Sequence, residues 1–382
     1  MPATDLSTAV DAVTVPDPVS EDRLSSLLLD LVTAVGPAHP TDLTRLTELV
    51  QLTLDDSLAA AFADPVPADA VAAEAAVAEQ IVLLARVWGP FAAWWRSYFA
   101  DGVDVPLCDL WRLYLPFAQW IVREKRRRRP AGPFMVGFNG SPGAGKTVLT
   151  NALAVVLDQL LDPDTEGRAI ARSGDDWYLG KADREPLRAR GYDPGVAGVS
   201  NRSLPGTHDL VWLERDLRQI ERSGPDLVIR MGNFDKRADD QRPNAFEIRG
   251  KVGVLLFDLW FAGADTRVEP ERLPVGLPRE VAVELRRWRG IFDRLDALWA
   301  FEWPSLEQMR RDREAQERLI EQRSGSRGMT AEQIRAFTSY MVERSWDWQL
   351  TSPVPPARAV TFHARRGPDH RVIHVWRGER AS

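Results

Sequence analysis

The sequence predicts an α/β fold in which helices flank a parallel β-sheet, with an all-helical extension in front of it. Four short segments have the pattern and length of strands in such a sheet, at residues 134–138, 168–172, 252–257 and 297–301, and a further strand is expected at 227–230. Segments with helical spacing of apolar residues lie between them, such as 149–160 and a helix expected from about 278. Strands that alternate with helices predict parallel pairing, because a crossover helix returns the chain to the same edge of the sheet.

The residues before 131 follow helical periodicity, in leucines at 24–31 and 43–50 and in an alanine-rich run at 68–87. Prolines, small residues and acids without such a pattern fill 1–20. We therefore expect a mobile tail over 1–20, a helical extension over 21–130 and an α/β domain over 131–382. Charged residues and the pair Gly89-Pro90 interrupt the apolar window 77–99, which predicts two buried helices rather than a membrane span.

The overall composition narrows the class of protein. With 382 residues, 44% of them hydrophobic and 27% charged, the chain can bury a sizeable core, and its net charge of -6 gives no general attraction to nucleic acid. The single cysteine, Cys108, excludes an intrachain disulfide and fits a reducing compartment. The first twenty residues lack the pattern of a secretory signal. We expect a cytoplasmic protein that binds no membrane.

A run of basic residues at 123–129 has two readings. Such a cluster is typical of a nucleic-acid contact or a localisation signal. It is also typical of a solvated helix end, where cations interact favourably with the carboxyl-terminal dipole. We favour the helix end, because no second basic patch with interleaved aromatic residues accompanies the run.

The most informative motif joins the first predicted strand to the helix that follows it. It fits the pattern G-x-x-x-x-G-K-[ST] with Gly140, Ser141, Pro142, Gly143, Ala144, Gly145, Lys146 and Thr147. Glycines let backbone N–H groups approach a polyphosphate, and the helix N-terminus adds partial positive charge. Lys146 is then expected to reach the β- and γ-phosphates, and Thr147 to be a Mg²⁺ ligand. A glycine-rich turn before an ordinary helix is the alternative, but the strand–loop–helix context predicts a P-loop NTPase-type sheet.

Carboxylates follow two of the other predicted strands. Asp175 and Asp176 come after 168–172, and Asp258 ends the apolar run at 252–257. In open α/β sheets, chemistry takes place at the carboxyl ends of the strands. The first pair therefore predicts a catalytic base and a partner in the metal shell, although both acids could instead cap the next turn. Asp258 stands where a Walker B-type strand places its magnesium ligand.

Further polar residues are candidates for the substrate side. His208 lies in a turn next to Asp209, and a substrate contact there is as plausible as a structural role. The cations around 233–237, Arg242 and those of a charged helix opening at 309–313 are candidates for a substrate clamp or a phosphate-covering lid, although single surface cations are usually only solvated. Three histidines (His363, His370 and His374) fall in a predicted hairpin without the companion ligands of a metal site.

Several separated segments together resemble one family. They are G-S-P-G-A-G-K-T, S-G-D-D-W-Y-L at 173–179, L-P-G-T-H-D-L at 204–210, N-F-D-K at 233–236, D-L-W-F-A-G at 258–263 and R-G-M-T-A-E-Q-I at 327–334. From about 134 to the C-terminus the chain resembles the D-glycerate 3-kinases, of the P-loop kinase superfamily that includes uridine kinase, phosphoribulokinase and bacterial pantothenate kinase. The pair D-D-[aromatic]-Y-L and P-G-T-H-D is the more specific signal, because the phosphate loop alone indicates any nucleotide enzyme.

This resemblance implies a P-loop kinase domain over 131–382 that transfers the γ-phosphoryl group of ATP, with Mg²⁺, to a hydroxyl of a small molecule, glycerate or a glycerate-like acid. It implies four catalytic residues: Lys146, Asp175, Asp176 and Asp258. Asp175 corresponds to the base for the acceptor hydroxyl, and Thr147 and Asp258 to the metal ligands. The implied substrate contacts are Tyr178, His208, Asp209, Asp235, Lys236, Arg242 and Arg310.

Three positions depart from the family pattern. Asp258 and Leu259 replace a Glu-Gly pair before Trp260, Arg237 replaces a serine after Asp-Lys, and Trp177 is the aromatic residue of the D-D motif. We expect these changes to surround the acceptor pocket and to leave the phosphate loop intact. Two alternatives therefore stay open. One is a kinase for another acceptor, such as a nucleoside, a pantothenate-like acid or a specialised intermediate; the other is a non-catalytic ATP-binding regulatory protein.

Overall fold

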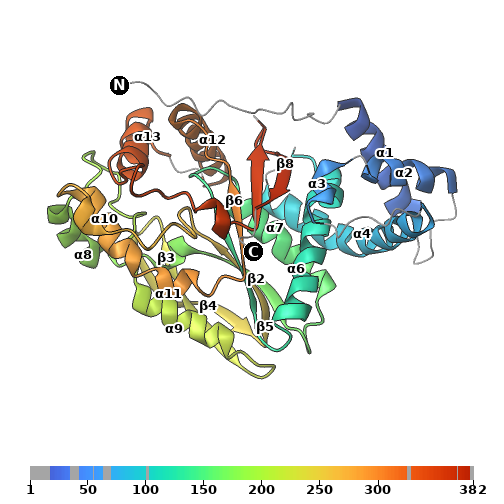
Figure 1. Cartoon of the computed structure of the whole chain (residues 1–382), viewed down its shortest axis with the longest axis horizontal. Coiled ribbons are helices and arrows are strands. Elements are labelled where there is room, and N and C mark those ends of the chain that lie inside the picture. Colours follow the sequence, from blue (N-terminus) through green and yellow to red (C-terminus); the bar gives the residue numbers. More distant parts are fainter. Residues whose placement is uncertain are drawn as a thin grey trace.

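The computed structural model describes residues 18–34, 43–54, 56–62, 70–99, 103–324, 328–367 and 369–378. Figure 1 shows a central sheet between two groups of helices, with the amino-terminal helices gathered at one end of the molecule. Residues 1–17 of the predicted tail lie outside the described residues. Helix α1 begins at Pro18, so the last three residues of the predicted tail, 18–20, belong to this helix.

The central sheet has six strands in the order β2-β5-β1-β6-β7-β8. Their bounds are β1 Phe134–Asn139, β2 Arg168–Ser173, β5 Val252–Asp258, β6 Ala297–Phe301, β7 Phe362–Arg366 and β8 Val372–Arg377. The first five are parallel, and β8 pairs with β7 in an antiparallel hairpin. The four predicted strands and the predicted hairpin are therefore confirmed, in a P-loop NTPase-type α/β fold.

Alternation along the strands divides the interior into two cores. In β1, Phe134, Val136 and Phe138 enter the core on the side of the helical extension, whereas Met135 enters the core on the opposite side. Successive strand residues point to opposite faces, so a strand buried on both faces reads as a continuous apolar run. This is why the sequence predicted β1 and β5 so clearly.

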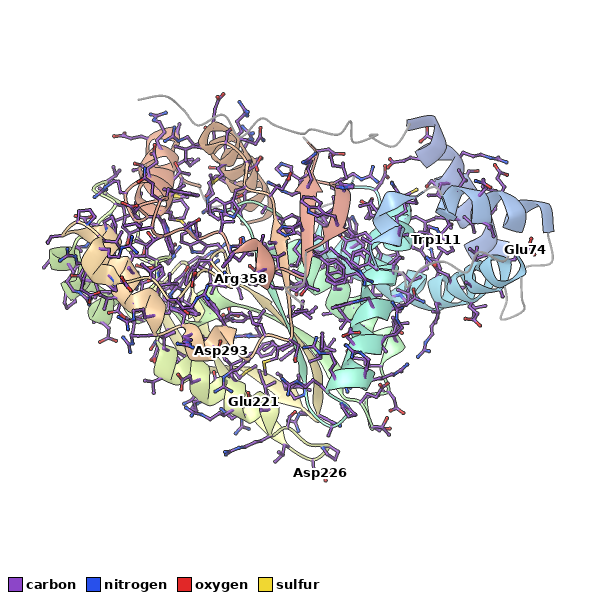
Figure 2. The ribbon with its side chains drawn as sticks, viewed as in Figure 1. Glu74, Trp111, Glu221, Asp226, Asp293 and Arg358 are labelled. Carbon is purple, nitrogen blue, oxygen red and sulfur yellow. The ribbon has the colours of Figure 1, made fainter. Side chains whose placement is uncertain are left out.

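The extension and the α/β domain share the first of these cores. The extension comprises α1 Pro18–Ala34, α2 Leu43–Leu54, α3 Ser57–Ala60, α4 Ala70–Tyr98, α5 Leu107–Asp109, the π-helical turn η1 Leu110–Tyr114 and α6 Leu115–Arg128. Helices α4 and α6 pack against α7 (Lys146–Leu160), and Phe117 stacks on Trp299 of β6 at 5.0 Å between ring centroids. Figure 2 labels the buried Trp111 in this part of the molecule and Glu74 farther out on α4. The extension therefore covers one face of the sheet.

Helix α4 corrects the prediction of two helices over 77–99. It is a single helix that continues through Gly89 and Pro90. Proline removes one helical hydrogen bond, but both residues are exposed, so water can satisfy the freed carbonyl while Val87 and Phe91 anchor the helix in the core. Among the described residues, the segment Glu74–Tyr98 is long and apolar enough to cross a membrane by length and composition, a test that core helices also pass.

The second core lies under the remaining helices. They are α8 Lys181–Arg184, α9 Leu210–Glu221, α10 Leu277–Arg286, α11 Arg289–Phe292, α12 Leu306–Ser324 and α13 Ala331–Thr338, with short 3₁₀ or π turns at Gly174–Trp177, Glu185–Arg190, Pro270–Arg272, Ser339–Glu343 and Ala357–Ala359. A separate two-stranded sheet pairs β3 Val228–Asp235 with β4 Asp240–Arg249. The sequence did not predict β4, because most of its side chains are exposed and it has no apolar alternation.

The basic run at 123–129 ends helix α6, as the favoured reading predicts. Its arginines make ion pairs within this chain: Arg126 with Glu166, Arg127 with Glu124, and Arg129 with Asp296, at 2.7 to 2.8 Å between nitrogen and oxygen. Lys125 is fully buried. The run therefore joins α6 to the loop before β2 and to the residue before β6.

Candidate active site

The phosphate loop occupies the turn between β1 and α7. Gly143 and Gly145 have φ of 81° and 80°, in the left-handed region where other residues are strained, and Gly145 is the N-cap of α7. A Cβ on Gly143 would lie 3.1 Å from the Cβ of Asp312 in α12, so this helix packs directly on the loop. The backbone conformation therefore favours glycine at both positions, and the close approach of α12 adds a second reason at Gly143.

Lys146 lies folded against its own loop. Its Nζ donates hydrogen bonds to the carbonyl oxygens of Gly140 at 2.8 Å and Ser141 at 3.0 Å, and the residue is buried. Burial lowers the pKa of Lys146, and the carboxylates of Asp258 and Asp175 oppose that shift. Lys146 is thus held by carbonyl groups of its own loop, within the electrostatic reach of two carboxylates.

Thr147 and Asp258 face each other across the ends of α7 and β5. The Thr147 hydroxyl donates to Oδ2 of Asp258 at 2.6 Å. Asp258 is buried, and burial raises its pKa while Lys146 opposes the rise. A hydroxyl and a carboxylate next to a phosphate loop are a donor set that suits Mg²⁺, which prefers oxygen and takes its other ligands from phosphates and water. The pair therefore fits the predicted metal site.

Asp175 occupies the centre of the site. Its Oδ1 accepts a hydrogen bond from the Tyr178 hydroxyl at 2.5 Å, and its Oδ2 pairs with Nζ of Lys236 at 2.7 Å. Burial alone would raise the pKa of Asp175, but the charge and hydrogen bond of Lys236 outweigh it and hold the pKa well below the usual range. Asp175 is thus an ionised carboxylate, and its charge acts on both Lys146 and Asp258.

Asp176 has a different environment from its neighbour. It completes a capping box, in which Oδ2 accepts the Ser173 backbone N–H at 3.1 Å, and it pairs with Arg172 at 3.1 Å. Burial raises its pKa to about 6, against the opposing charge of Arg172. The structural role that the sequence analysis considered for the pair therefore belongs to Asp176, while Asp175 faces Lys236 and Tyr178.

The two most specific motif segments are joined by backbone hydrogen bonds. The N–H of Leu179 donates to Thr207, the N–H of Asp209 donates to Trp177, and Tyr178 forms a bridge with His208. The His208 ring packs on Tyr178 at 4.5 Å between centroids and is enclosed by Phe261 and Trp288. This pairing explains why both segments are needed to build one site.

His208 is buried and neutral at pH 7. Burial lowers its pKa to about 4, although the charge of Asp175 favours the protonated ring. Neither ring nitrogen has a hydrogen-bond partner among the residues that the structure describes. Its contact with Tyr178 supports the tyrosine that holds Asp175.

The other predicted substrate residues lie in several places. Asp209 caps α9, accepting the Trp212 N–H at 2.9 Å. Asp235 accepts the backbone N–H groups of Arg237 and Ala238 and pairs with Arg242, so these two candidates neutralise each other in the β3–β4 hairpin.

Arg310 points to α13, with Nε 3.2 Å from Oγ1 of Thr338. Of the predicted set, Tyr178 and Lys236 bond directly to Asp175, and His208 packs on Tyr178.

Two departures from the family pattern have different environments. Trp177 is fully buried in the core, and its Nε1 donates to Oδ2 of Asp216 at 2.9 Å, so its side chain faces the interior. Arg237 is exposed in the turn between β3 and β4, next to Lys236, which pairs with Asp175. That Arg237 lies at the acceptor pocket stays a prediction.

Two further arginines act on this region: Arg313, which the sequence analysis named only within the charged helix opening at 309–313, and Arg202, which it did not name. Burial lowers the pKa of Arg313 in α12, and the charge of Arg202 lowers it further. Two acids act in the opposite direction: Glu317, which pairs with Arg313 at 2.5 Å, and Asp175. Arg202 pairs with Asp239 at 2.6 Å, and its charge also reaches Tyr178. The signal that could have found Arg313 is its spacing from the buried Met309, because residues four apart share a helix face.

Comparison with known proteins assigns the fold. No family model matches the chain. A curated protein named uncharacterized kinase mug58, from Schizosaccharomyces pombe, is 25% identical over 234 residues, covering 57% of this chain and 81% of that protein. A D-glycerate 3-kinase from Cryptococcus neoformans var. grubii is similar in structure, with TM-score 0.50, 20% identity and coverage of 68% of this chain and 97% of that one.

A second solved structure, that of YGR205w protein, has TM-score 0.57 and 21% identity, and covers 69% of this chain and 97% of that one. Identities this low assign the fold alone. The resemblance to the P-loop kinases is confirmed at that level, since a D-glycerate 3-kinase shares the architecture over nearly its whole length. The matches leave about 30% of this chain uncovered, and the extension of roughly 110 residues predicted at 21–130 is of that size.

Proposed function

We propose that the protein transfers the γ-phosphoryl group of ATP to a hydroxyl of a small acid such as glycerate. The loop at 140–147 would hold the phosphates, and Lys146 would balance their charge. Thr147 and Asp258 would hold Mg²⁺, which supplies charge neutralisation on the transferred group when bound. Asp175 would accept a hydrogen bond from the hydroxyl group of the acceptor. This assignment leaves Asp176 a positioning role through Ser173 and Arg172.

The observation that carries the proposal is the setting of Asp175. A half-buried carboxylate, held by Tyr178 and Lys236, acts electrostatically on both Lys146 and Asp258. An ionised carboxylate there would accept a hydrogen bond from the acceptor hydroxyl and aim its oxygen. Because its pKa is held low, its main contribution would be orientation, with proton transfer late in the reaction, as suits a loose phosphoryl-transfer transition state.

The preference for an acid over a nucleoside rests on charge. Three cations from separate segments of the chain act on this region. Lys236 pairs with Asp175, and the charge of Arg202 affects both Tyr178 and Arg313. Guanidinium groups recognise carboxylates through paired hydrogen bonds. Each of these cations is paired here with an acid of this chain, Asp175, Asp239 or Glu317, and the carboxylate of an acid acceptor would compete for the same groups. A neutral nucleoside would make no use of their charge. The single cysteine and the fold agree with a cytoplasmic enzyme.

The test is a screen for acceptor-dependent ADP release by the purified full chain with Mg-ATP. The acceptors would include D- and L-glycerate, other small hydroxy acids, pantothenate, uridine and cytidine. We expect a hydroxy acid to give the highest kcat/KM. A nucleoside as the best acceptor would contradict the acid preference, and tight ATP binding with no ADP release for any acceptor would favour the non-catalytic alternative.

A further inference from the structure

Arg366 brings strand β7 to the phosphate loop, beside helix α12. It ends strand β7, next to β6 in the sheet. Its Nη1 lies 3.4 Å from the carbonyl oxygen of Gly143 and 3.0 Å from Nδ1 of His370, and its Nη2 donates to Oδ2 of Asp312 at 2.9 Å. The guanidinium thus joins the tip of the loop to helix α12.

The buried ion pair between Arg366 and Asp312 costs desolvation free energy, which a functional role for Arg366 would explain. The side chains of Arg366 and Asp312 are only 7% and 2% exposed, and both ions lose most of their hydration. Among the described residues, Nε of Arg366 has no hydrogen-bond partner. Arg366 also helps to lower the pKa of Lys146, so the two cations act on one another at the loop. A purely structural ion pair would need neither the second cation, Lys146, nor the unpaired Nε of Arg366. A polyphosphate has enough oxygens to accept hydrogen bonds from both groups.

A backbone hydrogen bond followed by ion pairs connects the residue after Arg366 to the helical extension. Arg371, at the end of the β7–β8 turn, accepts through its carbonyl oxygen the Gly367 N–H at 2.8 Å. Its guanidinium pairs with Glu21 of α1 at 2.8 Å and with Asp109 of α5 at 2.6 Å. Glu21 is in turn bonded to Arg112, at 2.9 Å. The turn that follows Arg366 is therefore tied on its outer side to the first described helix of the chain.

We propose that Arg366 binds nucleotide phosphate beside Lys146, and that the extension is a positioning element that holds it there through Glu21 and Arg371. Asp312 occupies the guanidinium until phosphate competes for it. The extension would then act on nucleotide affinity, without touching the acceptor. This inference rests on the proposed function, because it takes a nucleoside triphosphate as the ligand.

The contact is tested by comparing Asp312→Asn with the double variant Asp312→Asn/Arg366→Gln, because neither leaves a buried carboxylate without its partner. Calorimetric titration with Mg-ATP should give an affinity about tenfold lower for the double variant, as for one charge-assisted contact. Adenosine, which has no phosphates, should bind both equally. Equal ATP affinity, or an equal loss for adenosine, would overturn the phosphate contact.

Arg365 provides the matched control. It is the neighbouring arginine on β7, and its ion pair with Glu302, at 2.6 Å, is partly exposed. Glu302→Gln and Glu302→Gln/Arg365→Gln should bind Mg-ATP equally well. A tenfold difference in this control pair would mean that charge anywhere on β7 affects ATP binding, and would overturn the specific role of Arg366.

The positioning role is tested with a double-mutant cycle. Glu21→Gln should weaken Mg-ATP binding about threefold in the wild-type chain and have no further effect when Asp312→Asn/Arg366→Gln is present, since residues that act through one contact are not additive. Glu48→Gln, in the exposed pair with Arg23, should change nothing. Equal losses from Glu21→Gln in both backgrounds would show a merely structural role.

The two proposals fail in distinguishable ways. Nucleotide affinity is measured without an acceptor, so a protein that binds ATP through Arg366 but releases no ADP would contradict only the proposed reaction. A protein that phosphorylates an acceptor normally, with unchanged ATP affinity in Asp312→Asn/Arg366→Gln, would contradict only the role of Arg366.

Discussion

The two halves of the proposed active site, its nucleotide side and its acceptor side, are built in different ways. The phosphate loop is eight consecutive residues between one strand and one helix, and Lys146 bonds to carbonyls within that loop. The acceptor side comes from separate segments, where Asp175 meets Lys236 from the β3–β4 hairpin, 61 residues later. A contiguous site can be recognised as a motif, whereas a site assembled by tertiary folding requires the structure.

The largest expected effect comes from removing the charge of the nucleotide side. Lys146→Ala should lower kcat/KM by about a thousandfold, or about 4 kcal/mol of transition-state stabilisation, because no other group in the loop carries its charge to the phosphates. Steady-state ADP release would measure it, and circular dichroism would check the fold. Arg127→Ala, at the exposed end of α6, is the control and should retain full activity.

The second prediction concerns the two adjacent acids of the acceptor side. Asp175→Asn should lower kcat by about 10² to 10³-fold with nearly unchanged ATP affinity, because the carboxylate orients the acceptor hydroxyl. Asp176→Asn should mainly lower the free energy of unfolding, by about 1 kcal/mol, through its capping box. If Asp176→Asn shows the loss of kcat and Asp175→Asn does not, the assignment within the pair must be reversed.

The third prediction uses pH to probe the packing behind Asp175. The folded-state pKa of His208 is about 4, below the unfolded value near 6.5, so the neutral ring is favoured in the folded state. The stability it contributes is complete above pH 6.5 and is lost as pH falls toward 4. Between pH 7 and pH 5 this amounts to about 2 kcal/mol. Urea unfolding of His208→Gln should lose correspondingly less over that interval, and an equal loss in both proteins would contradict a neutral buried histidine.

Much of the architecture could be predicted from the sequence, and the misses have physical causes. Strands β1 and β5 are buried on both faces and so are continuous apolar runs, whereas β4 is exposed and is held by pairing with β3. The phosphate loop needed only local residues. The split between Asp175 and Asp176 depended on which acid meets Arg172, and Trp177 lies in the interior because its indole finds Asp216 on another helix. Contacts between residues so far apart in the chain produce no recognisable pattern in the sequence.

The smallest expected effect separates two arginines of helix α12, the proposed lid, that lie one turn apart. Arg310 bonds to Thr338 of α13, whereas Arg313 lies within the electrostatic reach of Asp175 and Arg202. Arg313→Gln should raise KM for the acid acceptor about tenfold, or about 1.4 kcal/mol, with little change in KM for ATP, because it removes one charged contact from the acceptor side. Arg310→Gln is the matched control and should change either KM by less than twofold. A larger effect from Arg310→Gln would mean that α12 presents its other face to substrate during turnover, and that the acceptor side is assembled only when the lid moves.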